Sequence, residues 1–152
     1  MSVRWLNFIF WIVLCMLAGF IGSQFSPGEW YLSLQKSSLT PPNIVFPIVW
    51  NILFVLMAIA AWRVSEKQRQ KLSYAVALFI IQLGFNVLWS YLFFGLQRPD
   101  LAMIDILILW TLILFTVLIF YRIDKLAGAL LIPYLTWVGF AIYLNYTIYI
   151  LN

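Results

Sequence analysis

The third of five apolar stretches carries polar side chains that are rare in lipid. Gln82, Asn86 and Trp89 follow one another at helical spacing, with Phe93 one turn further on, so a helix places them on one face. An amide that faced acyl chains would leave polar atoms unpaired, so Gln82 and Asn86 should face protein or a ligand. Two interpretations stay open: the amides hydrogen-bond to neighbouring helices, or they help to line a binding cavity.

Aromatic and small side chains form two more stripes that could line the same cavity. One stripe lies in the second apolar stretch and the other in the last. Their members are Phe46, Trp50, Phe54 and Met57, and Trp137, Ala141 and Asn145. Bulky indoles beside a small residue such as Ala141 would form a slot with flat aromatic walls. The stripes therefore predict a pocket for flat apolar ligands.

Residue types that serve conventional catalysis or metal binding are scarce. The chain has no histidine, and its single cysteine, Cys15, lies in an apolar stretch where we expect it only to pack. We therefore expect no metal site and no conventional catalytic motif. Asp105 is the only acid inside an apolar stretch. Two roles stay open for it: a proton relay, or a structural carboxylate stabilised by a helix N-terminus and interfacial water.

The composition places the chain among membrane proteins. Hydrophobic residues make up 65% of it, charged residues make up 9%, and the mean hydropathy is +1.00. Five runs are long enough to cross a bilayer, and because they lack period-two alternation they must be helices. We expect an all-α integral membrane bundle that forms a single domain. Its expected partner is membrane lipid, and no nucleic acid is expected. The expected domain covers residues 1–152, with helices at about 5–25, 43–63, 72–96, 101–122 and 126–150.

The segment 26–42 separates the first two helices and is rich in Ser, Pro and Gly. Loops of this length are usually functional or disordered. Disorder is disfavoured here because Trp30, Tyr31 and several leucines would gain from burial. We therefore expect a partly folded cap.

The basic residues predict an orientation, because five spans put the two termini on opposite faces of the membrane. Seven of the nine Lys and Arg residues share the face of the N-terminus: Arg4, Arg63, Lys67, Arg69, Lys71, Arg122 and Lys125. Only Lys36 and Arg98 lie on the other face. This bias puts the N-terminus inside and the C-terminus and cap outside. The first apolar run is longer than a signal-peptide core and lacks a clear cleavage site, so we expect it to be retained.

Two further patterns concern helix packing. Pro133 lies inside the fifth expected helix, where it removes a backbone donor and predicts a bend. Small residues at a spacing of four in the first helix allow close helix approach. They are Cys15, Ala18, Gly19, Gly22 and Ser23. Packing within the bundle and packing between subunits both remain open, and we expect a homodimer.

Several segments together resemble the translocator protein family, TspO/MBR. The segments are WYLSL from Trp30 followed by Lys36, the pair Pro41 and Pro42, VFPIVW from Val45, QLGFNVLWSYLFF from Gln82, Asp105, and LIPYLTWVGFAIYLNY from Leu131. The resemblance covers nearly the whole chain, and its motifs are jointly specific.

This resemblance implies a membrane receptor or sensor that binds porphyrins, above all protoporphyrin IX, and other flat hydrophobic ligands such as isoquinoline-carboxamide and benzodiazepine drugs. By the resemblance, the lining residues are Tyr31, Pro42, Phe46, Trp50, Phe54, Asn86, Trp89, Trp137 and Ala141, to which the first stripe adds Gln82. Trp50 and Trp137 match the two tryptophans that the family is thought to use in light- and oxygen-dependent porphyrin breakdown, which makes them the candidate catalytic residues. The implied location is a bacterial cell membrane.

The chain departs from the family pattern in two places. No Lys or Arg follows Tyr146, so the cholesterol-recognition pattern of the animal proteins is incomplete. Lys36 is followed by Ser37 rather than by proline. Without histidine, the chain also offers no good axial ligand for haem iron, so metal-free porphyrin is the expected ligand and no cofactor is expected.

Four functions remain open at this point. The chain is a tetrapyrrole receptor, a photo-oxidative enzyme, a transporter, or a scaffold in which the aromatic residues only pack helices. Lys36 and Arg98 could meet the propionate groups of a porphyrin at the outer mouth, or merely extend to the interface. Transport has the least support from the residues, because inverted repeats and broken helices are not apparent.

Overall fold

A computed structural model describes residues 3–68 and 73–152 of the chain. The elements in chain order are α1 (Val3–Ser23), α2 (Glu29–Ser33), α3 (Val45–Lys67), α4 (Tyr74–Ser90), the π-helical turn η1 (Tyr91–Gly95), α5 (Pro99–Ile123), α6 (Lys125–Leu130) and α7 (Ile132–Leu151). The predicted start of the third helix at residue 72, and the basic residues Arg69 and Lys71, lie outside the described residues.

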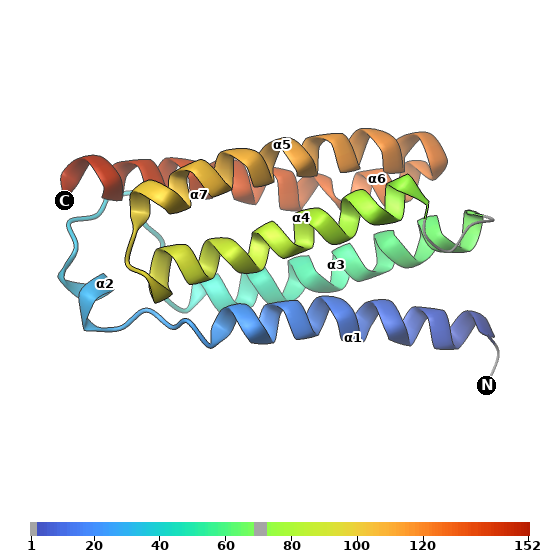
Figure 1. Ribbon diagram of the computed structural model, residues 1–152, viewed down its shortest axis with the longest axis horizontal. Helices are drawn as coiled ribbons and strands as arrows, with labels where there is room; N and C mark the ends of the chain where they lie inside the picture. The colour runs from blue at the N-terminus through green and yellow to red at the C-terminus, as the bar shows by residue number, and fades with distance from the viewer. Residues whose placement is uncertain (1–2, 69–72) are drawn as a thin grey trace.

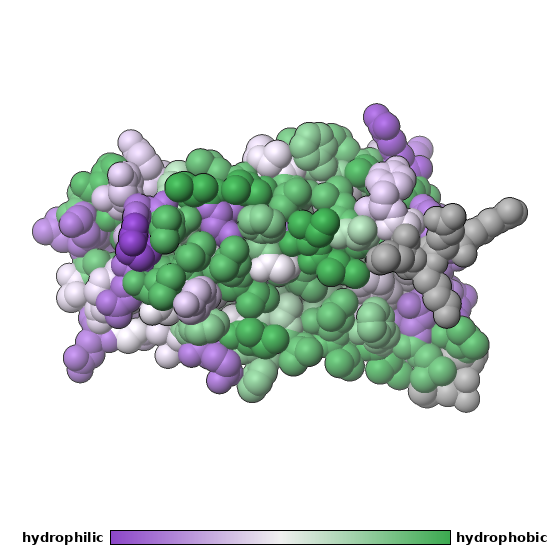
Figure 2. All heavy atoms as spheres, viewed as in Figure 1, coloured by the Kyte–Doolittle hydropathy of each residue, from purple (hydrophilic) through white to green (hydrophobic). Residues whose placement is uncertain are grey.

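Within residues 3–68 and 73–152, five helical segments are long and apolar enough to cross a membrane. They are α1, α3, α4 continued by η1, α5, and α6 continued by α7. Apolar side chains cover the middle of the face shown in Figure 2, and polar ones gather toward its two ends, as a bilayer requires. The predicted all-α membrane bundle of five spans is therefore confirmed.

The helices pack side by side with the termini at opposite ends (Figure 1). Helix α1 packs against α3 and α4, while α5 packs against α4 and α7, and α3 also contacts α6. Small side chains of α3, including Ala58, Ala60 and Ala61, are fully buried in the shared core with Phe79 and Phe120. The rings of Phe79 and Phe120 stack with centroids 5.8 Å apart and so join α4 to α5.

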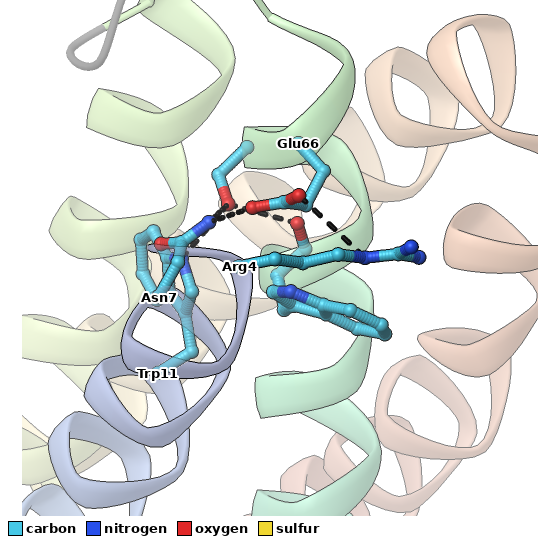
Figure 3. Close-up of polar contacts among 6 residues, drawn as sticks. Arg4, Asn7, Trp11 and Glu66 are labelled. Atoms are coloured by element: carbon cyan, nitrogen blue, oxygen red, sulfur yellow. Dashed lines mark hydrogen bonds and ion pairs between the residues drawn. The ribbon is translucent and has the colours of Figure 1, made fainter. Parts of the chain in front are cut away.

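Polar contacts fix α1 on α3 near the N-terminal end of the bundle (Figure 3). The Asn7 side-chain amide donates hydrogen bonds to Ser65 Oγ, at 2.9 Å, and to Glu66. The Trp11 indole donates to the same Ser65 oxygen at 3.0 Å, and Arg4 lies 3.7 Å from the Glu66 carboxylate. Because several donors converge on one turn of α3, the register of α1 along α3 is well defined.

The buried carboxylate of Asp124, between α5 and α6, joins these two helices to α3 at the same end of the bundle. Asp124 caps α6 by accepting hydrogen bonds from the backbone N–H groups of Leu126 and Ala127 at 2.9 and 3.1 Å. Its other oxygen forms ion pairs with Arg63 and Lys67, each at 2.9 Å. These contacts engage the last turns of α3, whose residues 64–67 were expected to lie between the second and third helices but are helical.

The fifth span is interrupted at Leu131, between α6 and α7. Pro133 lies in the first turn of α7, where its missing N–H leaves no helical hydrogen bond unmade. The bend that Pro133 predicts therefore appears as a break between two helices.

The small residues of α1 are used within the bundle. Cys15 and Ala18 are buried in the core. A side-chain carbon added at Gly19 would lie 2.8 Å from the ring of Phe54, and one at Gly22 would lie 3.3 Å from the Ser90 hydroxyl. Close approach of α1 to α3 and α4 thus explains this stripe.

Candidate ligand-binding site

The segment between α1 and α3 folds over one end of the bundle and contains the single-turn helix α2 (Figure 1). Trp30 and Tyr31 pack edge-on against Phe93, with ring centroids 5.8 and 6.3 Å apart. Tyr31 also packs on Phe94, at 5.5 Å. Tyr31 is thus buried and Trp30 half-buried on the π-helical turn η1, so the loop forms an ordered cap, although its Leu32 and Leu39 are exposed, contrary to expectation.

Hydrogen bonds tie the cap to the end of α7. The Gln35 backbone N–H donates to the Asn152 side-chain oxygen at 2.9 Å, and the Asn152 amide donates to the Gln35 carbonyl at 3.0 Å. The hydroxyls of Ser37 and Tyr143 share a hydrogen bond of 2.8 Å. The cap, which begins at the end of helix α1, is therefore held at its other side to α7.

The two cations on the cap side are engaged by protein groups. The Lys36 ammonium lies 4.5 Å from the centre of the Tyr31 ring and donates to the Leu34 carbonyl at 3.2 Å. Burial raises the pKa of Tyr31, so its phenol stays protonated beneath Lys36. Arg98 is paired through two nitrogens with Asp100. Neither cation lines the cavity beneath the cap.

Beneath the cap lies a cavity of about 630 Å³, bounded by the cap, α1, α3, α4, η1, α5 and α7. Eight of the predicted ligand-binding residues line it: Tyr31, Phe46, Trp50, Phe54, Asn86, Trp89, Trp137 and Ala141. The structure brings the two candidate catalytic residues, Trp50 and Trp137, to the walls of this one cavity. Pro42 is exposed in the loop and does not line it.

Aromatic rings from different helices form the walls. Phe46 of α3 packs edge-on against Trp137 of α7, with centroids 5.9 Å apart. Trp89 of α4 stacks on Phe93, at 4.9 Å and an interplanar angle of 22°. Trp50 lies 5.6 Å from Phe54 at a tilt of 31°. These surfaces are flat and apolar, which suits a flat apolar guest.

A buried chain of hydrogen bonds supports the inner wall. Asn86 Nδ2 donates to the Tyr134 hydroxyl at 2.9 Å, and that hydroxyl donates to Gln82 Oε1 at 2.8 Å. Asn86 therefore lines the cavity and also bonds to a neighbouring helix, so the two interpretations of this residue are compatible. Gln82 does not line the cavity; its side chain is buried in the bundle, where it accepts the hydrogen bond from Tyr134.

Asn145 lies on a predicted stripe but was not among the predicted ligand-binding residues, and Tyr134, which supports the wall without lining the cavity, was not predicted. Asn145 lines the cavity, accepts from the Trp89 indole at 3.0 Å and donates to the Pro99 carbonyl at 2.9 Å. It thereby fixes the Trp89 ring and ties α7 to the start of α5. Its place on the Trp137 and Ala141 stripe was the available signal. For Tyr134 the signal was only a hydroxyl in an apolar segment.

Asp105 is more deeply buried than its position near the start of α5 suggests. Its side chain is 4% exposed, and neither carboxylate oxygen has a hydrogen-bond partner among the described residues. It does not line the cavity. Interfacial water therefore does not surround this carboxylate.

These features define a class: a helical membrane protein of five spans with an aromatic-walled cavity beneath a folded extramembrane cap. The model of the TspO/MBR family matches residues 11–151, and the chain belongs to that family. The tryptophan-rich protein TspO of Chlorobaculum tepidum is 46% identical over 146 residues, which cover 93% of this chain and 92% of that protein.

Two further relatives are similar over most of the chain. The tryptophan-rich sensory protein of Cereibacter sphaeroides is 36% identical over 152 residues, covering 100% of this chain and 95% of the relative. The human translocator protein is 34% identical over 139 residues, covering 88% and 82%. The family shown by these comparisons is the one that the motifs resemble, so the inferred resemblance is confirmed.

Proposed function

We propose that this protein is a membrane receptor that binds protoporphyrin IX and other flat hydrophobic ligands in the cavity beneath the cap. The observation that carries the proposal is the convergence of Trp50, Trp89 and Trp137, from three different helices, on one cavity. A planar macrocycle placed between such walls would bury apolar area on both faces and gain aromatic stacking. The names of relatives such as the tryptophan-rich sensory protein agree with a sensing role.

The few polar groups of the cavity suit a metal-free porphyrin. The chain contains no histidine, so no imidazole is present to hold a haem iron from within the cavity. Asn86 and Asn145 are fixed by their hydrogen bonds and present oriented amides to the guest. Such groups orient a ligand, while the aromatic walls supply most of the contact area.

A fluorescence titration tests this proposal. Protoporphyrin IX added to the purified protein should quench tryptophan emission saturably. Replacement of Ala141 by Trp should abolish saturable quenching, because the larger ring occupies the cavity. Ala129→Trp is the matched control, since Ala129 is exposed on α6 and lines no part of the cavity. Quenching that never saturates in the unmodified protein would remove the proposal.

Light-dependent porphyrin breakdown is a second activity that the same residues could support. Indole is readily oxidised, and an excited porphyrin beside Trp50 and Trp137 could transfer an electron or pass its energy to dioxygen. We expect the Trp50→Phe, Trp137→Phe double variant to bind porphyrin and to lose illuminated breakdown, measured by the decay of porphyrin absorbance. Unchanged decay would show that these two side chains are not the reactive groups.

Transport of tetrapyrroles or other hydrophobic metabolites is the alternative. Its support is the name translocator protein carried by the animal relatives. Porphyrin flux into liposomes with and without the protein distinguishes a transporter from a receptor, because only a transporter accelerates the flux.

We further propose that the protein resides in a bacterial cell membrane as a homodimer, with the N-terminus inside and the C-terminus and cap outside. Arg63 and Lys67 lie at the N-terminal end of the bundle, where the cytoplasmic face is expected. A reporter enzyme fused after Asn152 should be active only outside the cytoplasm. A cytoplasmic signal from that fusion would reverse the orientation.

A further inference from the structure

A second hollow lies on the outside of the bundle, in the seam between α3 and α7. It has a volume of about 680 Å³. We call it the α3–α7 groove, and its lining residues are Val49, Ile52, Leu53, Leu56, Ile132, Pro133, Thr136, Trp137 and Phe140. Both helices belong to membrane spans, so the groove opens toward lipid hydrocarbon.

The groove offers little hydrogen bonding to a guest. Its polar side-chain groups are the Thr136 hydroxyl, which already donates to the Ile132 carbonyl at 3.0 Å, and the indole N–H of Trp137. No charged residue lines it. A head group or a polar ligand would lose most of its hydration here with little compensation. A saturated acyl chain, by contrast, matches this lining.

The groove lies beyond the break in the fifth span. Before the break, α6 packs on α3, and small residues of both helices, among them Ala127, Ala60 and Ala61, are buried in the same core cluster. Beyond the break at Leu131, α7 carries Trp137 and Phe140, whose rings lie 5.8 Å apart and line the groove. The hollow therefore falls where the fifth span carries large rings instead of small side chains.

We propose that the α3–α7 groove is a binding site for a lipid acyl chain, and that Trp137 transmits its occupancy to the cavity. Trp137 is the one described residue that lines both hollows. Its indole therefore forms the partition between a chain in the groove and a guest in the cavity. The effect on ligand binding rests on the proposed function, whereas the acyl-chain site does not.

The contacts of Trp137 allow it to respond to both sides. Its ring packs on Phe46 and Phe140, but its N–H has no hydrogen-bond partner within residues 3–68 and 73–152. The indoles of Trp89 and Trp110, in comparison, are each fixed by a hydrogen bond, to Asn145 and to the Leu135 carbonyl. A ring held only by apolar contacts can shift when one neighbouring space is filled.

Photo-crosslinking tests the acyl-chain site without any porphyrin. The protein is placed in nanodiscs of phosphatidylcholine that carries a diazirine in one acyl chain, illuminated, and digested for mass spectrometry. Adducts should concentrate on the segments 49–56 and 132–140. Thr136→Phe, which fills the groove, should lose them. Thr111→Phe is the matched control, because Thr111 is also exposed and its hydroxyl donates to Leu107 at 2.9 Å, but it lines neither hollow.

A second measurement follows Trp137 itself. In protein labelled with 5-fluorotryptophan, the fluorine resonance lost in Trp137→Phe identifies Trp137. That resonance should shift when nanodiscs of straight-chain lipid replace nanodiscs of bulky methyl-branched lipid, and Thr136→Phe should remove the shift while Thr111→Phe preserves it. The same resonance should move when protoporphyrin IX is added.

The outcomes separate the two proposals. Adducts spread evenly over all lipid-facing helices, or unchanged by Thr136→Phe, overturn the acyl-chain site, whatever the porphyrin titration gives. A groove protected from the lipid only in dimeric particles shows that a second copy of this chain occupies it, and also overturns the proposal. If adducts form in the groove but the Trp137 resonance does not change with the lipid, the acyl-chain site stands and its link to the cavity is refuted. Saturable porphyrin binding would stand in each case.

Discussion

At the level of single residues, Tyr134 links the cavity wall to the core of the bundle. Its hydroxyl accepts from Asn86 and donates to Gln82, and the whole side chain is buried. Two amides from one face of α4 therefore depend on one hydroxyl from α7. A buried network of this kind is stabilising only while its members keep their partners.

Removal of the Tyr134 hydroxyl should be costly. Tyr134→Phe leaves Asn86 Nδ2 and Gln82 Oε1 unpaired in an apolar interior, so we expect a loss of about 1–2 kcal/mol of stability. Tyr143→Phe is the control on the same helix, because its hydroxyl meets Ser37 at the exposed edge of the cap and should cost under about 0.5 kcal/mol. Unfolding of both variants by SDS in mixed micelles measures the difference. Equal stabilities would mean that the network contributes nothing.

At the level of elements, the cap depends on anchors that are far away in sequence. Its residues Trp30, Tyr31 and Leu34 join the apolar cluster around η1, and its backbone is tied to Asn152 at the end of α7. The segment 26–42 contains four Ser and three Pro and too few apolar residues to be ordered by itself. Contacts with η1 and α7 supply the order.

Loss of the α7 anchor should loosen the cap. Asn152→Ala removes both hydrogen bonds to Gln35, so amide hydrogen exchange in residues 29–39 should accelerate while exchange in α5 stays unchanged. Gln24→Ala is the control, since the Gln24 side chain bonds only to the Phe20 carbonyl within its own turn. If both variants exchange alike, the aromatic packing on η1 alone holds the cap.

At the level of the whole molecule, Asp124 joins the second span to the last two. Burial disfavours its ionisation, but contacts with Lys67, the Ala127 N–H and Arg63 outweigh burial and hold the pKa of Asp124 well below its usual range. The carboxylate therefore contributes stability that is fully present above the unfolded pKa of about 3.9 and is lost as the pH falls further.

Substitution of Asp124 should expose this contribution. Asp124→Asn leaves Arg63 and Lys67 without their partner, and we expect a loss of about 3 kcal/mol at pH 7, near the low end for a buried pair because both cations reach water. Below about pH 4, the stability of the variant should also decline less than that of the unmodified protein. Asp100→Asn, in an exposed pair with Arg98, should change the thermal midpoint little. Thermal unfolding midpoints of both variants and of the unmodified protein, measured from pH 3 to pH 7, test these expectations.

The sequence by itself determined the five spans, their helical form, the family and the main aromatic residues of the cavity wall. Apolar runs must satisfy their own backbone in lipid, and a helix turns fixed spacing into a shared face, so Trp89 with Asn86 and Trp137 with Ala141 were found from spacing or motif.

Only the tertiary structure decided what each side chain meets across the helix boundaries. Gln82 and Asn86 share one stripe, yet only Asn86 lines the cavity, whereas Gln82 is buried and accepts a hydrogen bond from the Tyr134 hydroxyl of α7. The pairing of Asp124 with α3, the engagement of Lys36 and Arg98, and the groove beside Trp137 likewise depend on how separate helices are placed. Spacing along one helix carries no information about the distance to another, and that distance is set by packing.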